Sequence, residues 1–317
     1  MPQTEFHLAH LTDFHIFQSS GASWRAFLNK RSLSYLSWRL RRGRTNPPEV
    51  LTRLLDGFPS RIPDHVVITG DLTHMGLPRE LMRVRGVLEQ IGPPERVFVV
   101  PGNHDALVAS SGEPLRRAWD DYMAADRGYR GSGSDSDPGV YPRVRERNGV
   151  ALVGLSSALP TRPFSAAGRL GDAQCRRLAN VLERTGRRRL FRVVLVHHPI
   201  INGQVKPRKS LRDAAKLRSV LRRQGAELVL HGHSHRHSRE HLDGPASPIP
   251  VVGLPSSTAA HTDPVKAACL RIFSIVSQGE GWRIDVRDLR SDHSGSGPHA
   301  TVASEWSLGY AAPNRSK

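Results

Sequence analysis

Residues 96–105 read Arg-Val-Phe-Val-Val-Pro-Gly-Asn-His-Asp, an apolar run that ends in a cluster of polar side chains. β-Branched and aromatic residues dominate the run, which predicts a buried strand over 96–100. Proline and glycine end this strand, so Asn103, His104 and Asp105 are expected in the loop at its carboxyl end. Amide, imidazole and carboxylate groups of this kind are suitable ligands for a divalent metal ion.

Four other segments of the chain are rich in the same ligand types, and most of them also follow an apolar run. They are Asp13-Phe14-His15, Gly70-Asp71, His197-His198-Pro199 and His231-Gly232-His233-Ser234-His235. In an open α/β sheet the loops at the carboxyl ends of the strands form the ligand-binding crevice, so these five loops are expected to meet at one edge. A single Asp-x-His or Gly-Asp motif is weak evidence for a metal site. A cluster of histidines at the end of a strand is stronger evidence, because such polar residues rarely serve as packing in a hydrophobic core.

Two of these motifs leave a choice open. Either member of the His197-His198 pair is placed to face the metals. In the last motif, His231 and the nearby His237 are candidates for solvated side chains that bind nothing.

Strand-like and helix-like stretches alternate along most of the chain. Strands are expected at 5–12, 64–69, 96–100, 149–155, 190–196 and 227–230, and helices at 48–58, 78–91, 172–185 and 210–223. Such alternation implies crossover connections and a largely parallel sheet. From about residue 249 to 289 the pattern is strand-rich and hairpin-like, so two packed sheets with flanking helices accommodate the whole order.

Length and composition set the limits of the molecule. The chain has 317 residues, and we expect one domain over 1–290, followed by a disordered tail over 291–317 that is rich in Ser, Gly and His. The sequence contains neither a long apolar stretch nor a signal-peptide pattern, so no transmembrane helix and no secretion are expected. The two cysteines, Cys175 and Cys269, imply no disulfide framework and fit a reducing cytoplasm.

The net charge is +17, with a pI near 11. Such a surface favours polyanionic partners, namely nucleic acid, anionic lipid or phosphorylated small molecules. Composition drift in an arginine-rich genome explains the charge equally well, because the basic residues are spread along much of the chain.

Residues 17–46 are interpreted as a basic amphipathic insertion that overhangs the ligand set. Over 24–44 this insertion has no acidic residue, and its arginines are interleaved with aromatic residues and leucines, as in segments that lie at a membrane interface. Three interpretations stay open. The insertion packs as a lid with its arginines in solvent, it binds an anionic membrane surface with Trp24 and Trp38 at the interface, or it contacts nucleic acid, which no motif supports beyond charge.

The ligand types select the metals. Carboxylates and imidazoles without a thiolate suit two divalent ions drawn from Mn, Fe, Zn and Co. Asp71 is the natural candidate for a carboxylate that bridges the two ions. A water shared by two such ions loses a proton near neutral pH and becomes a nucleophile, which is a common means of cleaving phosphate esters.

The five motifs follow one another in the order D-x-H, G-D, G-N-H-D, H and G-H-x-H. In this order, residues 5–255 resemble the calcineurin-like metallophosphoesterase superfamily. The resemblance implies a four-layer α/β/β/α sandwich, with two mixed β-sheets flanked by helices. It also implies two ligand sets that share one aspartate. The first metal would be held by Asp13, His15, Asp71 and His235, and the second by Asp71, Asn103, His197 and His233.

The resemblance assigns further roles around these ligands. His197 is preferred over His198 because the ligand in the family ends its strand. His104 is similar to the catalytic histidine of the family, which binds no metal. It would stabilise or protonate the departing oxygen, with its ring oriented by Asp105. A hydroxide that bridges the metals would attack phosphorus in line, without a covalent phosphoenzyme.

One departure from the family pattern narrows the subclass. The Ser/Thr phosphoprotein phosphatases and the dinucleoside tetraphosphatases carry Asp-Arg-Gly just after the second motif and Gly-Asn-His-Glu at the third. Here the second motif continues Leu72-Thr73-His74-Met75-Gly76 and the third ends in Asp105, so the phosphate-gripping arginine is missing. The chain is therefore more similar to bacterial phosphodiesterase branches, which include cyclic-nucleotide phosphodiesterases, glycerophosphodiesterases and UDP-2,3-diacylglucosamine pyrophosphatases.

These observations predict a dinuclear metal-dependent phosphodiesterase whose substrate is cyclic-nucleotide-like or lipid-linked. One alternative is a UDP-2,3-diacylglucosamine-type pyrophosphatase that acts at the membrane surface. Another is a non-catalytic interaction scaffold on the same fold, against which the complete ligand set argues. The expected location is the cytoplasm, at the inner membrane face if residues 24–44 bind lipid. Nucleic acid is not the expected partner, and the oligomeric state is left open.

Overall fold

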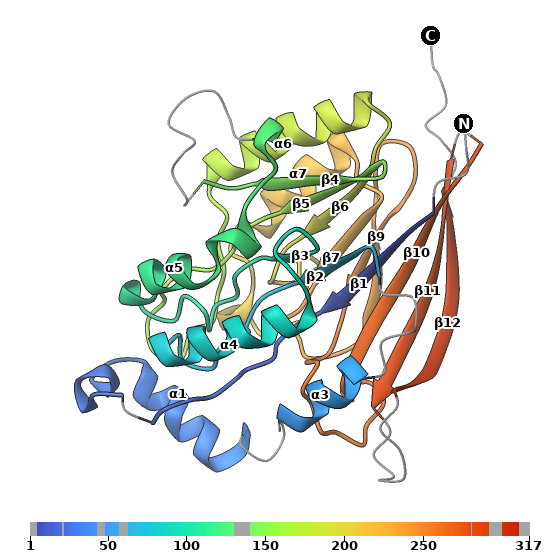
Figure 1. Ribbon diagram of the computed structural model, residues 1–317. Coiled ribbons are helices and arrows are strands. Elements are labelled where there is room, and N and C mark those ends of the chain that lie inside the picture. Colours follow the sequence, from blue (N-terminus) through green and yellow to red (C-terminus); the bar gives the residue numbers. More distant parts are fainter. Residues whose placement is uncertain are drawn as a thin grey trace.

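Two six-stranded β-sheets form the centre of the computed structural model, which describes residues 5–20, 22–42, 48–56, 63–129, 140–279, 281–291 and 300–310 (Figure 1). In spatial order the first sheet contains β12 (Ala300–Tyr310), β11 (Gly281–Ser291), β10 (Cys269–Gln278), β1 (Glu5–Leu11), β2 (His65–Ile68) and β3 (Val97–Val99). The second contains β4 (Arg143–Arg147), β5 (Val150–Gly154), β6 (Phe191–Leu195), β7 (Leu228–His231), β9 (Ile249–Gly253) and β8 (Ser238–Leu242).

Both sheets are mixed. Strands β1, β2 and β3 are parallel to one another, and so are β5, β6, β7 and β9. In the first sheet an antiparallel meander of β10, β11 and β12 lies on one side of β1. In the second sheet the two edge strands, β4 and β8, pair antiparallel with their neighbours. Parallel strands need crossover connections, which helices supply except between β7 and β9, where strand β8 lies in the connection.

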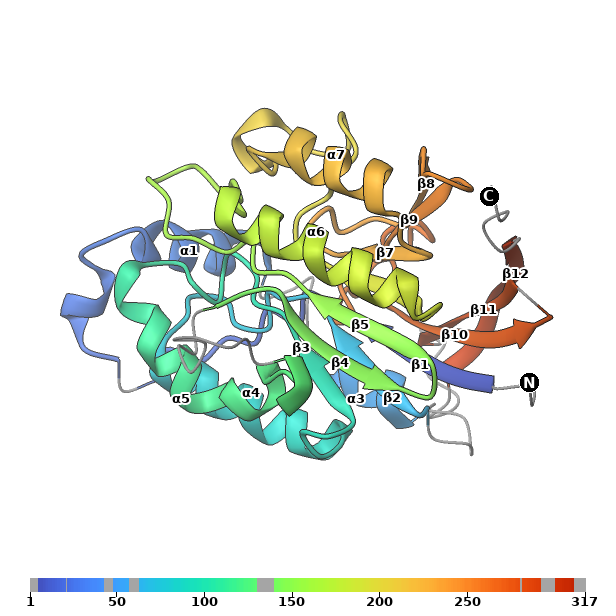
Figure 2. The same cartoon turned by 90° about the horizontal axis from the view of Figure 1, so that it is seen from above.

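Helices cover the outer face of each sheet (Figure 2). The first sheet is covered by α3 (Pro48–Asp56), α4 (Pro78–Ile91) and α5 (Gly112–Met123), and the second by α6 (Asp172–Arg187) and α7 (Ala214–Gln224). Short 3-10 turns η3 (Ala109–Ser111), η4 (Arg127–Tyr129) and η5 (Pro207–Lys209) lie in the connections. The four layers α/β/β/α that follow from this order confirm the predicted fold class.

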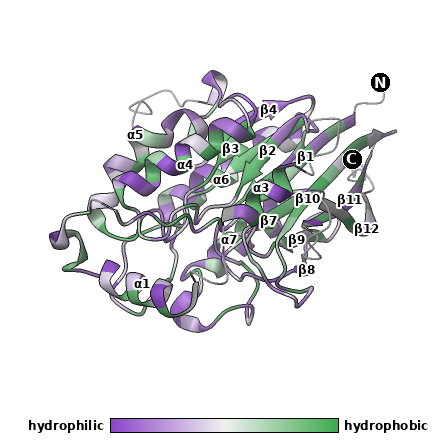
Figure 3. Cartoon of the chain, turned by 60° about the horizontal axis from the view of Figure 1, so that its bottom comes forward, coloured by the Kyte–Doolittle hydropathy of each residue, from purple (hydrophilic) through white to green (hydrophobic). Residues whose placement is uncertain are grey.

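Three apolar layers hold the sandwich together. The layer between the sheets contains Phe98, Phe191 and Phe273, and the two outer layers join each sheet to its helices. Figure 3 shows hydrophobic residues along the central strands and more hydrophilic ones on the outer helices. Because both faces of each sheet are covered, the central strands read as continuous apolar runs, which made them recognisable in the sequence.

The predicted disordered tail over 291–317 is wrong for Ala300–Tyr310. These residues form β12, which pairs antiparallel with β11 along its length. Trp306 packs against the apolar layer between the sheets, and this single anchor outweighs the low apolar content that suggested disorder. Residue 291 ends β11, and 292–299 and 311–317 lie outside the described residues.

Residues 24–42, which we call the cap, follow the first motif and lie beyond the carboxyl end of β1 (Figure 1). The cap consists of a 3-10 turn η1 (Trp24–Phe27), helix α1 (Arg31–Ser37) and a π-helical turn η2 (Trp38–Arg42). The rest of the predicted basic segment, including Arg44, lies outside the described residues.

The cap is docked onto the body by one buried arginine and by aromatic rings. Arg31 donates hydrogen bonds to the carbonyls of Met75 and Gly76 and to Ser111 Oγ. Trp38 stacks on Phe17 with ring centroids 3.7 Å apart. The expectation that the arginines of a lid stay in solvent is therefore wrong for Arg31, which is buried against the body. Trp38 is half-buried, and its place at a membrane interface stays a prediction.

Glu80 supports the loop below the cap with a buried carboxylate. Its oxygens accept hydrogen bonds from the backbone N–H groups of Met75, Leu77 and Gln18. Burial nevertheless raises the pKa of Glu80 to about 7 from its ordinary 4.5, since the backbone donors offset only part of the desolvation. The folded protein therefore binds this proton more tightly than the unfolded chain does.

This pKa predicts a pH-dependent stability difference between the wild type and Glu80→Gln. The stabilisation that comes from the raised pKa is fully present below pH 4.5 and disappears as the pH rises through about 7. The stability of the wild type relative to that of Glu80→Gln should therefore fall by about 2 kcal/mol between pH 5.5 and pH 8. Chemical denaturation of both proteins at the two pH values measures this change, and a difference that stays constant contradicts the assignment.

Candidate metal centre

All seven predicted metal ligands lie in loops at the carboxyl ends of parallel strands. Asp13 and His15 follow β1, Asp71 follows β2 and Asn103 follows β3 in the first sheet. In the second sheet His197 follows β6, and His233 and His235 follow β7. The two sheets meet here, since His197 Nδ1 lies 2.7 Å from the carbonyl oxygen of Thr69 in the loop after β2.

The first group of converging side chains contains Asp13, His15 and His235. His235 Nε2 lies 3.2 Å and His15 Nε2 lies 3.6 Å from the same oxygen, Asp13 Oδ1. The two imidazole nitrogens are themselves 3.0 Å apart. Asp13 Oδ1 is buried and accepts no hydrogen bond in the structure, so three donor atoms of metal-ligand type face one point.

The second group contains Asp71, His197 and His233, with Asn103 beside them. His197 Nε2 lies 3.3 Å from Asp71 Oδ2 and 3.1 Å from His233 Nδ1. Asn103 Oδ1 lies 3.3 Å from the same His197 nitrogen. The structure thus brings together the residues that the resemblance assigns to the second metal, and Asp71 lies at the junction of the two groups by its charge interactions with His197 and His15.

Neighbouring carbonyls orient the imidazoles of the second group. His197 Nδ1 donates to the Thr69 carbonyl, and His233 Nε2 donates to the Lys209 carbonyl at 2.9 Å. In a neutral ring each of these bonds uses the N–H, so the lone pair lies on the other nitrogen. These other nitrogens, His197 Nε2 and His233 Nδ1, lie 3.1 Å apart within the second group. This is the tautomer that a metal ligand requires.

The backbone is strained at the ligands themselves. Five of the seven predicted ligands have a positive φ, between 49° and 63°, although none of them is glycine. These residues are Asp13, His15, Asp71, His233 and His235. Such conformations cost free energy at each position and persist where the surroundings require them, which is typical of functional sites.

Two glycines permit the close approach of the ligand carboxylates. A Cβ at Gly102 would lie 2.2 Å from Asp71 Oδ1, and a Cβ at Gly232 would lie 2.4 Å from Asp13 Oδ2. Both distances are below any real contact, so any side chain at these positions would push a predicted ligand away from the centre.

The substitution Gly102→Ala is therefore expected to weaken metal binding by about 10- to 100-fold, as the loss of an orienting contact commonly does. The matched control is Gly86→Ala within α4, where an added Cβ has no neighbour within 4 Å. That control should keep full metal affinity and gain about 0.5–1 kcal/mol of stability. Titration of the apo proteins with Mn²⁺ measures both, and equal affinities would contradict the role given to Gly102.

The charges at the centre call for cations. Burial acts to raise the pKa of Asp71, but His197 and His104 hold it well below its ordinary value. Burial acts to lower the pKa of His197, yet the Asp71 carboxylate raises it to about 9. Two buried carboxylates thus draw positive charge onto an imidazole, and two divalent ions at the same donor atoms would supply that charge without the proton. The donor set fits such ions, since it has no thiolate and offers imidazole and oxygen ligands.

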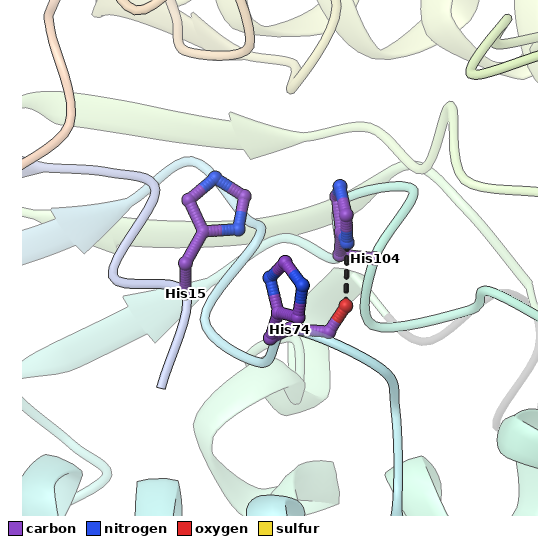
Figure 4. A group of neighbouring side chains, drawn as sticks. All are labelled: His15, His74 and His104. Carbon is purple, nitrogen blue, oxygen red and sulfur yellow. Dashed lines mark hydrogen bonds between the residues drawn. The ribbon is translucent and has the colours of Figure 1, made fainter. Parts of the chain in front are cut away.

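His104 lies beside the first group, as Figure 4 shows together with His15 and His74. Its Nδ1 donates to the carbonyl oxygen of His74 at 2.6 Å, and the rings of His74 and His104 stack with centroids 5.3 Å apart. The ring of His104 also meets that of His15 edge-on, with a centroid distance of 4.9 Å. The bond to His74 turns the opposite nitrogen, Nε2, away from the carbonyl.

The expectation that Asp105 orients the His104 ring is wrong. The carboxylate of Asp105 accepts hydrogen bonds from the backbone N–H and hydroxyl of Thr73 and from the backbone N–H of Gly102. It therefore joins the loops of the second and third motifs, and a backbone carbonyl orients His104 in its place. These bonds satisfy two buried backbone N–H groups, those of Thr73 and Gly102.

His74 is the residue that sequence reasoning missed. Besides the bond to His104, its Nε2 lies 2.9 Å from the carbonyl oxygen of Ser34 in the cap. His74 therefore connects the cap to the His104 ring. The sequence offers one signal for His74, a histidine three residues after Asp71.

The histidine pairs of the fourth and fifth motifs are resolved by their contacts. The ring nitrogens of His198 meet Ser157 Oγ and the Ala166 carbonyl, so His197 is the member that faces Asp71. His231 is fully buried behind the site, and His237 is only partly exposed beside Arg271. The expectation that these two are solvated side chains is wrong.

Comparisons with known proteins agree with this geometry. A family model described as calcineurin-like phosphoesterase matches residues 6–237. A dimetal phosphatase from Danio rerio is structurally similar, with a TM-score of 0.55 and 15% sequence identity over 94% of this chain and 98% of that one. At this identity the likeness shows a shared fold. No curated protein matches the sequence.

Two other solved structures have lower TM-scores. A 5'-nucleotidase precursor from Thermus thermophilus has a TM-score of 0.43 and 12% identity over 96% of this chain and 54% of that one, so the present chain spans about half of its length. Vacuolar Protein Sorting 29 from Cryptosporidium parvum has a TM-score of 0.39 and 13% identity, with 96% and 100% covered. Within the described residues, no helix is long and apolar enough to cross a membrane. The family match covers most of the chain and contains all five motifs, and the protein therefore belongs to the calcineurin-like phosphoesterase family.

Proposed function

We propose that this protein is a dinuclear metal-dependent phosphodiesterase. What carries the proposal is the convergence of Asp13, His15 and His235 on one side of Asp71, and of His197, His233 and Asn103 on the other. Each group offers the mixture of imidazole and oxygen donors that Mn, Fe, Zn or Co ions prefer. Two such ions would activate a water and neutralise charge on the phosphoryl group.

The side chains around these ligands would do the rest of the chemistry. Asn103, whose amide oxygen faces His197, has an amide N–H₂ that can donate to a phosphoryl oxygen. His104 Nε2 would donate a proton to the departing oxygen, because Nδ1 is already committed to the His74 carbonyl. The stacked His74 ring would hold the His104 ring in that orientation.

The distribution of positive charge favours a diester over a monoester. At neutral pH a phosphodiester carries one negative charge and a monoester close to two, so a monoester site gains more from additional cations. Residues 72–77, which pass beside the second motif, contain neither lysine nor arginine. Arg31 reaches this stretch from the cap, but its guanidinium donates to the carbonyls of Met75 and Gly76 and is thereby committed to the backbone.

Lys30 is the cation of the cap that reaches toward the centre. Its Nζ donates to Thr161 Oγ1 at 2.6 Å and to the Ser165 carbonyl at 2.5 Å, which joins the cap to the loop before α6. Burial lowers the pKa of Lys30, and the charge of the Asp71 carboxylate acts in the opposite direction. We therefore expect Lys30 to contact the single negative charge of a bound diester.

The substitution Lys30→Met tests this contact. Loss of one charge-assisted hydrogen bond to the substrate should raise KM by about tenfold while kcat changes little. Lys30→Arg should restore most of the loss, and the melting temperature of both variants is the control for a merely structural tie between the cap and Thr161. An unchanged KM in Lys30→Met would remove Lys30 from the substrate site.

Diester preference is tested with a matched pair of chromogenic substrates. With Mn²⁺ added, kcat/KM for bis(p-nitrophenyl) phosphate should exceed that for p-nitrophenyl phosphate by at least about tenfold, which corresponds to about 1.4 kcal/mol. The reverse order would contradict the proposal and favour a phosphomonoesterase. A panel of cyclic nucleotides, glycerophosphodiesters and UDP-sugar lipids then identifies the physiological substrate class.

A membrane-surface version of this function rests on the exposed face of the cap. Trp24, Leu28, Leu36 and Leu40 are each more than half exposed there. Arg25 and Arg39 lie on the same segment, as in helices that bind anionic lipid surfaces. These apolar side chains stay exposed although Arg31 is buried against the body, so docking of the cap leaves them available for lipid contact.

Vesicles of phosphatidylglycerol and phosphatidylcholine test this version by co-sedimentation. Serine at positions 24, 28 and 40 should abolish binding and leave cleavage of bis(p-nitrophenyl) phosphate unchanged. The matched control places serine at Met82, Phe164 and Val265, which are exposed apolar residues outside the cap. Equal binding by both triple variants would exclude the cap as a membrane surface.

A further inference from the structure

A second concave site lies among the strands of the C-terminal part of the chain. It is a cavity of about 360 Å³ between β8, the loop before β10, and β10, β11 and β12. It is lined by His237, Ser238, Arg239, Pro264, Val265, Arg271, Asp288, Arg290, Ser304 and Trp306. None of the predicted metal ligands lines it, and its volume falls in the range of small-molecule sites.

The cavity carries an excess of positive charge. Arg271 donates two hydrogen bonds, of 2.5 and 2.9 Å, to Asp288. The carboxylate that lines the cavity is therefore already paired with one arginine. Arg239 and Arg290 also line the wall, and among the described residues neither of them has a carboxylate partner. Two guanidinium groups therefore face one concave surface without a compensating anion.

The hydrogen bonds of the cavity show a matching surplus of donors. Arg271 Nη2 lies 3.0 Å from His237 Nδ1, and Arg290 Nη2 lies 3.4 Å from His237 Nε2. An imidazole has at most one lone pair when it carries any proton, so it can accept from only one of these guanidinium groups. One of the two contacts therefore places N–H against N–H, which an added acceptor would relieve.

The two arginines without carboxylates also have unused donors. Arg290 Nε is buried and has no hydrogen-bond partner. The guanidinium of Arg239 lies flat over Trp306, with Cζ 3.5 Å from the ring centroid, and such stacking leaves the N–H groups at its edge directed outward. An unsatisfied buried donor costs free energy, so the site gains when an anion with several acceptors enters.

We propose that this cavity binds a small phosphate-bearing anion, up to the size of a nucleoside monophosphate, between Arg239 and Arg290. A tetrahedral phosphoryl group offers several acceptors, and guanidinium forks match its geometry. A cation is disfavoured although His237, Cys269 and Asp288 lie close together. Both oxygens of Asp288 already accept from Arg271, and burial raises the pKa of the Cys269 thiol.

Calorimetric titration with inorganic phosphate and with AMP tests the proposal on three full-length proteins. The first is Asp71→Asn, in which binding at the metal centre is impaired and the cavity is intact. The second is the same variant with Arg239→Gln and Arg290→Gln added. The third is Asp71→Asn with Arg283→Gln and Arg287→Gln added. These two changes remove the same charge from exposed positions of β11 outside the cavity.

We expect phosphate or AMP to bind the first and third proteins with similar affinity, and the second at least about tenfold more weakly. Similar affinity in all three proteins, or no binding to the first, would overturn the proposal. If the second protein does not fold, Arg239→Gln alone replaces it, because that side chain is exposed and stacks on Trp306 without a hydrogen bond to the body. The arginine pair on its own should leave diester hydrolysis unchanged.

Discussion

Replacing Asp71 with asparagine should lower kcat for bis(p-nitrophenyl) phosphate by about a thousandfold or more. Asp71 lies where the two groups of predicted ligands meet, with Oδ2 3.3 Å from His197 Nε2 and Oδ1 accepting the backbone N–H of His104 at 2.7 Å. An amide is isosteric but carries no charge and only one acceptor atom. Loss of about 4 kcal/mol of transition-state stabilisation from a displaced metal corresponds to that factor.

The measurement is kcat together with the metal content of the purified protein. Asp71→Asn should lose at least one of the two ions, and circular dichroism should report an unchanged fold. The matched control is Asp121→Asn, which removes an exposed carboxylate that pairs with Arg85 on the outer helices. If Asp71→Asn keeps both ions and full activity, Asp71 is not the bridging ligand.

Replacing His104 with alanine should lower kcat by about 10²- to 10⁴-fold on a diester with an alkoxide leaving group. The same change should cost much less on bis(p-nitrophenyl) phosphate, because p-nitrophenolate leaves without needing a proton. The geometry behind this expectation is the bond from His104 Nδ1 to the His74 carbonyl, which presents Nε2 on the other side of the ring. Metal content should be unchanged, since His104 belongs to neither predicted ligand set.

The ratio of the two kcat losses is the measurement that assigns the role of His104. The control is His241→Ala, an exposed histidine on β8. Equal losses on both substrates would indicate that His104 stabilises charge rather than donates a proton. No loss on either substrate would exclude it from the reaction.

The sequence predicted well which loops carry the candidate ligands, because each of these residues follows a buried parallel strand. A continuous apolar run such as 66–68 or 193–196 is easy to recognise, and the carboxyl end of such a strand has a known place in an α/β sheet. Asp71 could therefore be placed with Asp13 and Asn103 at one edge of the first sheet, whereas its approach to His197 of the second sheet depends on how the two sheets pack. Strand bounds shifted by one or two residues, which does not move the loop that follows.

Contacts between distant segments could not be predicted in the same way. The docking of Arg31 on the carbonyls of Met75 and Gly76 depends on how the cap folds back, and an arginine in a basic stretch gives no sign of it. The bond from His104 to the His74 carbonyl is made by the backbone, which sequence patterns do not describe. Strand β12 depends on pairing with β11 and on one aromatic anchor, Trp306, which composition does not detect.

The central claim is that the five loops hold two ions. A crystal grown with Mn²⁺ and measured for anomalous scattering tests it most directly. Two peaks a few Å apart are predicted, one against Asp13, His15 and His235 and the other against Asn103, His197 and His233, with Asp71 in contact with both. A map without a peak at these residues, or with a single ion elsewhere on the chain, would contradict the account.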